Sequence, residues 1–178
     1  MNITLPDGSV RALEAGSNGL DLANDIGPGL AKAAIAVSVN GIQKDLCDPI
    51  NEDSEVSIIT IDSDEGLEIM RHTLTAQVLA RAVKNLYPDA KLAIGPTIKD
   101  GFYYDFEFVK SITPDDLDKI EKEMQRIISS KSAITKKLHS KKDALKVFSS
   151  IGESYKESII NESEQKDNFQ LYYQENDE

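Results

Sequence analysis

Six lysines lie within 16 residues of a chain that is otherwise acidic: Lys131, Lys136, Lys137, Lys141, Lys142 and Lys146. Asp143 is the only acid in this stretch. Ammonium groups at this density attract phosphate, so the stretch is the candidate nucleic-acid contact of the chain, centred on Lys136, Lys137, Lys141 and Lys142. The alternative is a solvated surface, which is the more common explanation for a run of charge.

Few other side chains could act as nucleophiles, bases or metal ligands. The chain has two histidines, His72 and His139, and one cysteine, Cys47. A single cysteine excludes an intrachain disulfide and a cysteine-cluster zinc site, and it favours a reducing, cytoplasmic compartment. Because no histidine accompanies Cys47 in the first half of the chain, we expect a small buried hydrophobic residue rather than a nucleophile.

Composition sets broader limits. The 178 residues are 40% hydrophobic and carry a net charge of −11, from 31 acidic and 20 basic residues. This charge argues against a general nucleic-acid coat or a membrane-surface binder, although it allows a local basic patch. No apolar run approaches the ~18 residues of a membrane-spanning helix, and the first residues do not have the pattern of a signal peptide.

Residues 1–62 predict a small α+β unit. Short strands are expected at residues 3–5, 35–39, 43–46 and 55–60, with a turn at residues 6–9 and a hairpin turn at Asn40-Gly41. A helix is expected at residues 19–26, ended by the Gly27-Pro28-Gly29 run, and a second short helix at residues 30–34. This order fits a β-grasp-like module. Residues 1–62 hold 10 acidic and 3 basic residues, against 21 and 17 in residues 63–178, so we place a domain boundary near Asp62.

Residues 63–178 predict a second α+β domain. Leu67, Met70, Leu74 and Val78 recur at helical spacing, which indicates a long amphipathic helix ending before Pro88. Strands at residues 92–98 and 102–108 flank a hairpin turn and would form an antiparallel sheet against it. Further elements are expected as helices at residues 114–127 and 140–148 and as strands at residues 134–138 and 169–174.

Two groups of motifs carry a family resemblance. The first comprises residues 3–9 (ITLPDGS), 25–34 (DIGPGLAKAA) and 39–41 (VNG). It resembles the TGS domain that opens bacterial threonyl-tRNA synthetases. The second comprises residues 79–88 (LARAVKNLYP), 93–106 (AIGPTIKDGFYYDF) and 152–156 (GESYK). It is similar to the first part of the editing domain of the same enzymes.

The resemblance implies a function in protein synthesis. Enzymes of this family charge tRNA with threonine using ATP, and they hydrolyse serine wrongly attached to that tRNA at a separate N-terminal site. Serine and threonine differ by one methyl group, which is worth only about 1–3 kcal/mol in a binding pocket, so hydrolysis has to supply the missing discrimination. The alternative interpretation is a non-catalytic regulatory or binding module that contains a TGS domain.

The resemblance also implies editing-site residues, of which this chain keeps some. Tyr104 and Lys156 match family positions. The family has two histidines spaced i, i+4 on the long helix; counting back from Pro88, these positions fall on Thr73 and Gln77, and His72 lies one residue too early. His72 and Gln77 are i, i+5, roughly 140° apart on a regular helix. A one-residue π-bulge would bring them closer.

The family's downstream Cys-x-x-x-His and catalytic core have no counterpart in these residues. We therefore interpret the chain as the N-terminal part of a longer enzyme, with a second domain that is incomplete at its C-terminal end; a naturally short protein is the alternative. No cofactor is expected in this chain. The resemblance implies ATP with Mg²⁺ and a catalytic-domain Zn²⁺ for the parent enzyme, a homodimer, and partners in tRNA and the rest of the synthetase.

Overall fold

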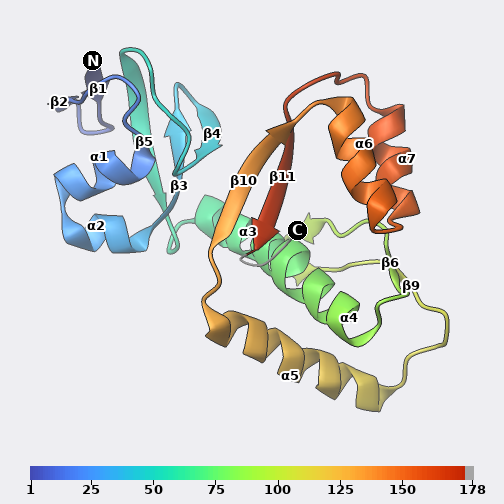
Figure 1. Cartoon of the computed structure of the whole chain (residues 1–178). Helices are drawn as coiled ribbons and strands as arrows, with labels where there is room; N and C mark the ends of the chain where they lie inside the picture. The colour runs from blue at the N-terminus through green and yellow to red at the C-terminus, as the bar shows by residue number, and fades with distance from the viewer. Residues whose placement is uncertain (175–178) are drawn as a thin grey trace. The chain divides into compact units, whose positions relative to one another are not determined.

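The computed structural model describes residues 1–174, so the last four residues of the second predicted domain lie outside the described part. The chain divides into two compact units, Met1–Met70 and Arg71–Glu178, each described by itself below (Figure 1). The division falls inside a helix, eight residues beyond Asp62, and the boundary near Asp62 stays a prediction. No helix among residues 1–174 combines the length and apolar character needed to cross a membrane.

Unit 1 is built on a five-stranded mixed sheet with the strand order β2-β1-β5-β3-β4. The central pair β1 and β5 is parallel, and the other neighbours are antiparallel. The strands are β1 (Asn2–Thr4), β2 (Val10–Ala12), β3 (Ala34–Val39), β4 (Ile42–Asp45) and β5 (Ser54–Thr60). Helices α1 (Gly19–Ile26) and α2 (Pro28–Ala33) complete the unit. The predicted β-grasp-like α+β module is confirmed.

Local sequence signals account for the turns of unit 1. Gly8 has a φ of +80°, and Leu5 exchanges backbone hydrogen bonds with Gly8 and Ser9 around the predicted turn. Asn40 and Gly41 have φ values of 51° and 78°, the positive pair that a tight hairpin between β3 and β4 requires. Asn18 caps α1 by accepting hydrogen bonds from the N–H groups of Leu20 and Asp21.

The core of unit 1 joins α1 to the sheet. Leu22 of α1 is fully buried together with Ile3 of β1 and Val37 of β3, with Val39, Ile50 and Val56 in the same cluster. Part of each strand shows the two-residue period: Val37 and Val39 are buried in β3, and Ser54 and Val56 in β5, whereas Ala36 and Ile59 depart from it.

Cys47 corrects one expectation. The thiol is exposed, not buried. It lies in the turn that follows β4, an edge strand, where the backbone N–H of Asp45 donates to Oδ2 of Asp48 and closes the chain on itself. The side chain between these two acids therefore points away from the core. The strand expected at residues 43–46 already left Cys47 outside, and the residue type alone suggested burial.

A close backbone contact ends β5 and starts helix α3 (Asp64–Thr73). The hydroxyl of Ser63 donates to the carbonyl of Thr60 (2.9 Å) and accepts from the N–H of Gly66 (3.0 Å). A Cβ on Gly66 would lie 2.0 Å from the Thr60 oxygen. Only glycine fits at this position without moving the backbone.

Unit 2 begins within the long helix. The helix runs from α3 through a π-helical segment, η1 (Leu74–Leu79), into α4 (Ala80–Leu86), and it ends before Pro88 as predicted. Helix α5 (Pro114–Ser130) packs beside α4 through a core of Ala82, Val83, Ala90, Ile120 and Ile127. A capping box starts α5: Thr113 and Asp116 exchange side-chain and backbone hydrogen bonds.

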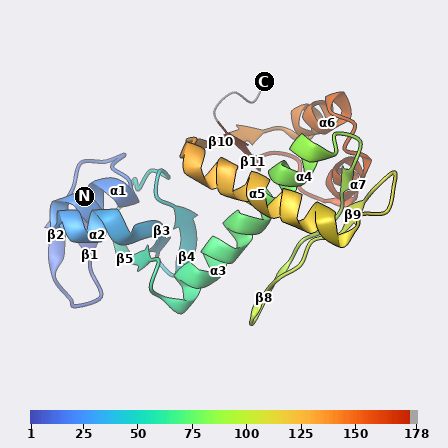
Figure 2. The same cartoon turned by 90° about the horizontal axis from the view of Figure 1, so that it is seen from below.

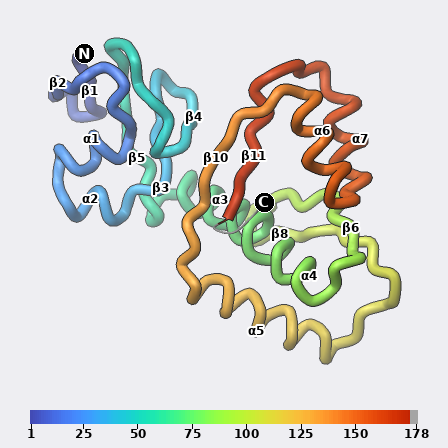
Figure 3. Tube along the Cα trace, viewed as in Figure 1, coloured from blue at the N-terminus to red at the C-terminus, as the bar shows by residue number. Residues whose placement is uncertain are grey.

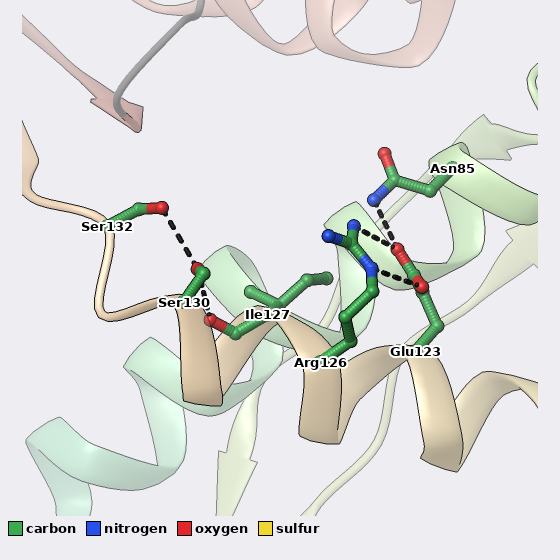
Figure 4. Close-up of polar contacts among 6 residues, drawn as sticks. All are labelled: Asn85, Glu123, Arg126, Ile127, Ser130 and Ser132. Atoms are coloured by element: carbon green, nitrogen blue, oxygen red, sulfur yellow. Dashed lines mark hydrogen bonds and ion pairs between the residues drawn. The ribbon is translucent and has the colours of Figure 1, made fainter.

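Polar side chains also bridge α4 and α5 (Figure 4). Asn85 Nδ2 donates to Oε1 of Glu123 at 2.7 Å, and the same carboxylate pairs with the Arg126 guanidinium at 2.6 Å. These contacts, Arg126 first, lower the pKa of Glu123 from 4.5 to about 2. Glu123 therefore stays ionised at neutral pH and accepts the hydrogen bond from Asn85 across the two helices.

The region after α4 is an irregular hairpin rather than two continuous strands. Its paired pieces are β6 (Lys91–Leu92) with β9 (Phe106–Glu107) and β7 (Thr97–Ile98) with β8 (Gly101–Phe102). The predicted turn between Ile98 and Gly101 is confirmed, and Figure 2 shows the hairpin as a narrow arm. The predicted strands are wrong in extent, because Pro96 has no N–H to offer the ladder.

The remaining elements form a second small layer of unit 2. Strands β10 (Ile134–His139) and β11 (Phe169–Gln174) pair antiparallel over their whole length, and helices α6 (Lys141–Ser150) and α7 (Ser154–Glu162) pack on them (Figure 3). Ala144, Ile160 and Leu171 form the buried centre of this layer. Ser140, the first residue of the helix expected at residues 140–148, caps α6 by accepting from the N–H of Asp143. Helix α7 was not predicted as a separate helix.

We predict that Gly66→Ala lowers the free energy of unfolding of unit 1 by roughly 1–3 kcal/mol, the usual cost of overpacking. The added methyl group has to displace backbone at Thr60 rather than a flexible side chain. Urea unfolding followed by circular dichroism measures the change. Gly29→Ala is the matched control, because a Cβ there meets nothing within 4 Å. Equal unfolding midpoints for the two variants would contradict the analysis.

Candidate editing-type site

The first turn of α7 connects to the hairpin through three side chains. Oε2 of Glu153 accepts from the N–H of Leu92, the Tyr155 hydroxyl donates to Oε2 of Glu107, and Lys156 Nζ donates to the carbonyl of Ala93. The run 152–156 (GESYK) therefore joins a helix to a hairpin about 60 residues earlier in the chain. Gly152 has a φ of +73°, which allows the sharp turn between α6 and α7.

Glu153 is an ionisable side chain in the interior of unit 2. It is 1% exposed. Its Oε1 lies 2.8 Å from Lys84 Nζ, and its Oε2 lies 3.0 Å from the Leu92 nitrogen. The same ammonium donates to the carbonyls of Pro88 and Ala90. Glu153 thus ties the start of α7 to the end of α4 and to β6.

Tyr104 lies against Gly95 on the other arm of the hairpin. A Cβ on Gly95 would lie 2.3 Å from the Tyr104 ring, so the ring rests directly on the glycine backbone. Two residues further along the chain, the ring of Phe106 stacks on that of Tyr104, with the ring centroids 4.6 Å apart. Gly95 therefore has no room for a side chain, because the Tyr104 ring occupies the space that a Cβ would need.

The structure brings Tyr104 and Lys156 together. Lys156 Nζ lies 5.6 Å from the centre of the Tyr104 ring, within cation–π range. Burial lowers the pKa of Lys156, and the Glu153 carboxylate opposes this shift. Burial, followed by the charge of Glu153, raises the pKa of Tyr104 to about 12.

These two side chains suit binding better than proton abstraction. With a pKa near 12, the Tyr104 hydroxyl keeps its proton at neutral pH and donates a hydrogen bond. Lys156 uses one N–H on the Ala93 carbonyl, which leaves its ammonium further donors for an anion, a hydroxyl or a carbonyl oxygen. The pair can hold and polarise a substrate, but it supplies no general base.

His72 and Gln77 lie on the long helix, apart from this pair. His72 is exposed at the end of α3, and Gln77 is half-buried within η1. Among residues 1–174, no hydrogen bond, ion pair or ring contact joins either side chain to Tyr104 or Lys156. The backbone carbonyl of Gln77 accepts from the Gln174 side chain.

The π-helical segment changes the register between His72 and Gln77. Within η1 the N–H of Ala80 donates to the carbonyl of Thr75, five residues earlier. The fully buried Thr75 hydroxyl donates back to the Arg71 carbonyl at 2.7 Å. A π-helical turn holds more residues than an α-helical one, so positions five apart lie closer around the axis than 140°. Gln77 is thereby turned towards the face that carries His72.

The four candidate lysines of the basic stretch have different surroundings. Lys137 and Lys142 are exposed, and Lys137 Nζ lies 4.6 Å from the centre of the Tyr173 ring. Lys136 is half-buried. Lys141 Nζ donates to the carbonyls of Asn161 and Ser163, so it caps the C-terminal end of α7. Lys137 and Lys142 are the members best placed to meet phosphate.

Sequence reasoning missed Glu153, Lys84 and Gly95 as parts of this arrangement. An acid just before a helix is ordinarily explained by the helix dipole, and a lysine on an amphipathic helix by solvent. The only available signal was the position of Glu153 and Gly95 inside the quoted motifs. Their contacts depend on tertiary structure.

Comparison with known proteins shows which family the chain resembles. The TGS domain family model matches residues 1–60. The threonine–tRNA ligase of Acidithiobacillus ferrooxidans (strain ATCC 53993 / BNL-5-31) is 45% identical over 173 residues, 97% of this chain. The chain is homologous to the N-terminal region of threonine–tRNA ligases.

Two further ligases show the same extent of similarity. The enzymes of Hahella chejuensis and Burkholderia lata are each 45% identical over 172 residues. In all three cases the match covers 27% of the ligase. The chain thus spans about a quarter of the length of the ligases it matches, and the similarity includes both units.

We predict that Gly95→Ala displaces the Tyr104 ring. Loss of burial should return the pKa of Tyr104 from about 12 towards its ordinary value of 10. Carbon-13 NMR of the tyrosine ring carbons, followed from pH 8 to 13, measures the midpoint. Gly101→Ala is the control on the same hairpin, since a Cβ there meets nothing within 4 Å. A Tyr104 midpoint that is the same in both variants would refute the steric assignment.

Proposed function

We propose that this chain is the tRNA-contacting and editing part of a threonine–tRNA ligase. In this proposal, unit 1 is an accessory domain, and unit 2 holds the end of a mischarged seryl-tRNA so that the ester can be hydrolysed. The enzyme that carries it would be cytoplasmic and homodimeric. The ATP, Mg²⁺ and Zn²⁺ of the charging reaction would belong to the rest of that enzyme, and no step is assigned to them in this segment.

The observation that carries the proposal is the Tyr104–Lys156 pair. The two side chains come from segments 52 residues apart in sequence, and the pair is held by Gly95, Ala93 and Glu153. The partly buried Lys156 ammonium lies 5.6 Å from the centre of the Tyr104 ring, and the ammonium and the tyrosine hydroxyl are two donors for a ribose hydroxyl or an ester carbonyl. Such donors stabilise charge that develops on an oxygen during ester hydrolysis.

Hydrolysis also needs a water molecule and a group that can accept its proton. Neither Tyr104 nor Lys156 is suited to that role, and among residues 1–174 the His72 imidazole of the long helix shares no hydrogen bond, ion pair or ring contact with either of them. Complete turnover therefore requires groups beyond those assembled in this segment. A segment that binds the tRNA end without completing the reaction is the function the geometry supports.

We predict that the 178-residue chain alone does not accelerate hydrolysis of seryl-tRNA above the buffer rate, whereas a full ligase that contains it does. In that ligase Lys156→Ala should slow hydrolysis about a hundredfold, the scale of losing one donor to a developing charge. A deacylation assay with labelled seryl-tRNA measures both. Lys122→Ala, an exposed lysine of α5, is the matched control.

Either of two results would overturn this assignment. Robust turnover by the isolated chain would show that its own residues complete the reaction. Normal hydrolysis by the Lys156→Ala ligase would favour the alternative, a non-catalytic TGS-containing binding module. Adding the His72→Ala ligase to the comparison shows whether the His72 imidazole takes part in hydrolysis.

We predict that tRNA binds weakly to unit 2 through Lys137 and Lys142, with a strong salt dependence. Replacing both with Glu should weaken binding and lower the slope of log K against log salt by about 1 for each lost phosphate contact. Fluorescence anisotropy at several salt concentrations measures the slope. Lys141 is left intact because it holds the end of α7.

The control is the double change Lys110→Glu and Lys122→Glu, which alters the net charge equally at exposed positions outside the basic stretch. If the two double variants bind tRNA alike at each salt concentration, the stretch is solvated surface rather than a contact.

A further inference from the structure

Glu153 is buried at the start of a helix, yet it does not cap that helix. An acid at the N-cap position ordinarily accepts from the N–H groups of the first turn. In α7 the N-cap side chain makes no such bond. Its carboxylate turns away from α7, to the Leu92 N–H and the Lys84 ammonium.

Burying a carboxylate is costly unless opposite charge and hydrogen bonds accompany it. Glu153 has both an opposite charge and a hydrogen bond. However, each partner also makes other contacts. Lys84 already donates to two carbonyls, and Leu92 pairs in β6. A hydrophobic residue at position 153 would avoid the cost of desolvation. The charge of Glu153 therefore calls for a role beyond packing.

Lys156 follows Glu153 by three residues, the spacing that places two side chains on the same side of a helix. The two residues hold adjacent residues of the hairpin: Glu153 the N–H of Leu92, and Lys156 the carbonyl of Ala93. The hairpin that carries Tyr104 is thus attached to the helix that carries Lys156 by two neighbouring bonds.

We propose that Glu153 is a positioning residue for the Tyr104–Lys156 pair, which it holds in place by attaching the start of α7 to β6 and α4. Lys156 and Tyr104 would meet the substrate, and Glu153 would not touch it. This inference rests on the proposed function, because the pair matters only if it binds the aminoacylated end of tRNA.

The electrostatic part of the inference has a definite sign. Burial lowers the pKa of Lys156 and the Glu153 carboxylate raises it. The ionisable groups that the contacts place around Lys156 are Glu153 on α7, Tyr104 on the hairpin and, through Glu153, Lys84 on α4. Glu107 on β9 is occupied by the Tyr155 hydroxyl. Glu153 is thus the negative charge that offsets burial.

The test is a pH titration of the 178-residue chain by carbon-13 NMR of labelled lysine side chains. In Glu153→Gln the midpoint of Lys156 should fall by about one unit, the usual effect of losing a nearby opposite charge. Loosening of the fold would act in the other direction, because loss of burial raises the midpoint towards 10.5. The sign therefore separates loss of the charge from loss of structure.

Two variants keep the test decisive. Glu157→Gln removes the same charge from the same helix turn and should leave the Lys156 midpoint within a few tenths of a unit. Glu153→Asp keeps the charge but retracts it by one methylene group, so its midpoint should lie between those of Glu153→Gln and the unchanged chain. If Glu153→Gln does not fold, the midpoint of Lys156 in Glu153→Asp decides the test. An unchanged or raised midpoint in Glu153→Gln, or an unchanged one in Glu153→Asp, overturns the proposal.

A binding measurement on the same samples separates this proposal from the proposed function. The probe is adenosine that carries serine through a non-hydrolysable amide at its 3′ position. Binding should shift the Lys156 signal in the unchanged chain and should weaken about tenfold in Glu153→Gln. If the probe leaves Lys156 unaffected in the unchanged chain, the proposed function fails, while the titration still decides whether Glu153 positions Lys156. If the probe binds equally to both chains, the positioning role fails.

Discussion

The arrangement of unit 2 depends on the need to satisfy one buried carboxylate. The Glu153 carboxylate is satisfied by Lys84 and by the Leu92 N–H, and losing either partner would leave a buried polar atom unpaired. These partners belong to α4 and β6, so the end of the long helix, the hairpin and α7 have to be in place together. The hairpin has few ladder bonds of its own, since its paired pieces are only two residues long. Its position relative to the helices therefore comes from polar contacts as much as from apolar packing.

Elements that are defined by neighbouring residues could be predicted from the sequence. The helix at residues 19–26, the turns at Gly8 and Asn40-Gly41, the cap at Ser140 and the end of the long helix before Pro88 all follow from local chemistry. The predictions failed where distant partners decide the outcome. The strands around Pro96 break because the proline cannot join the ladder, and α7 forms where its weakly amphipathic sequence gave little warning.

The candidate site was partly visible in the sequence. Tyr104 and Lys156 were named because their motifs resemble a family, and the structure places the two side chains next to each other. The residues that hold them were not named, because Lys84, Gly95 and Glu153 each have an ordinary explanation when read locally. The basic stretch shows the opposite case. Its composition suggested that all the lysines share one phosphate-binding surface, whereas Lys141 donates to backbone carbonyls at the end of α7.

The contact of Gly95 with the Tyr104 ring also restricts how the sequence can change over evolutionary time. Any side chain at position 95 collides with an aromatic ring at position 104. If residue 104 were smaller, the steric requirement for glycine at position 95 would disappear. Neither position can accept a bulkier or a smaller residue alone without losing the fit. The two positions are therefore expected to vary as a pair among descendants of a common ancestor.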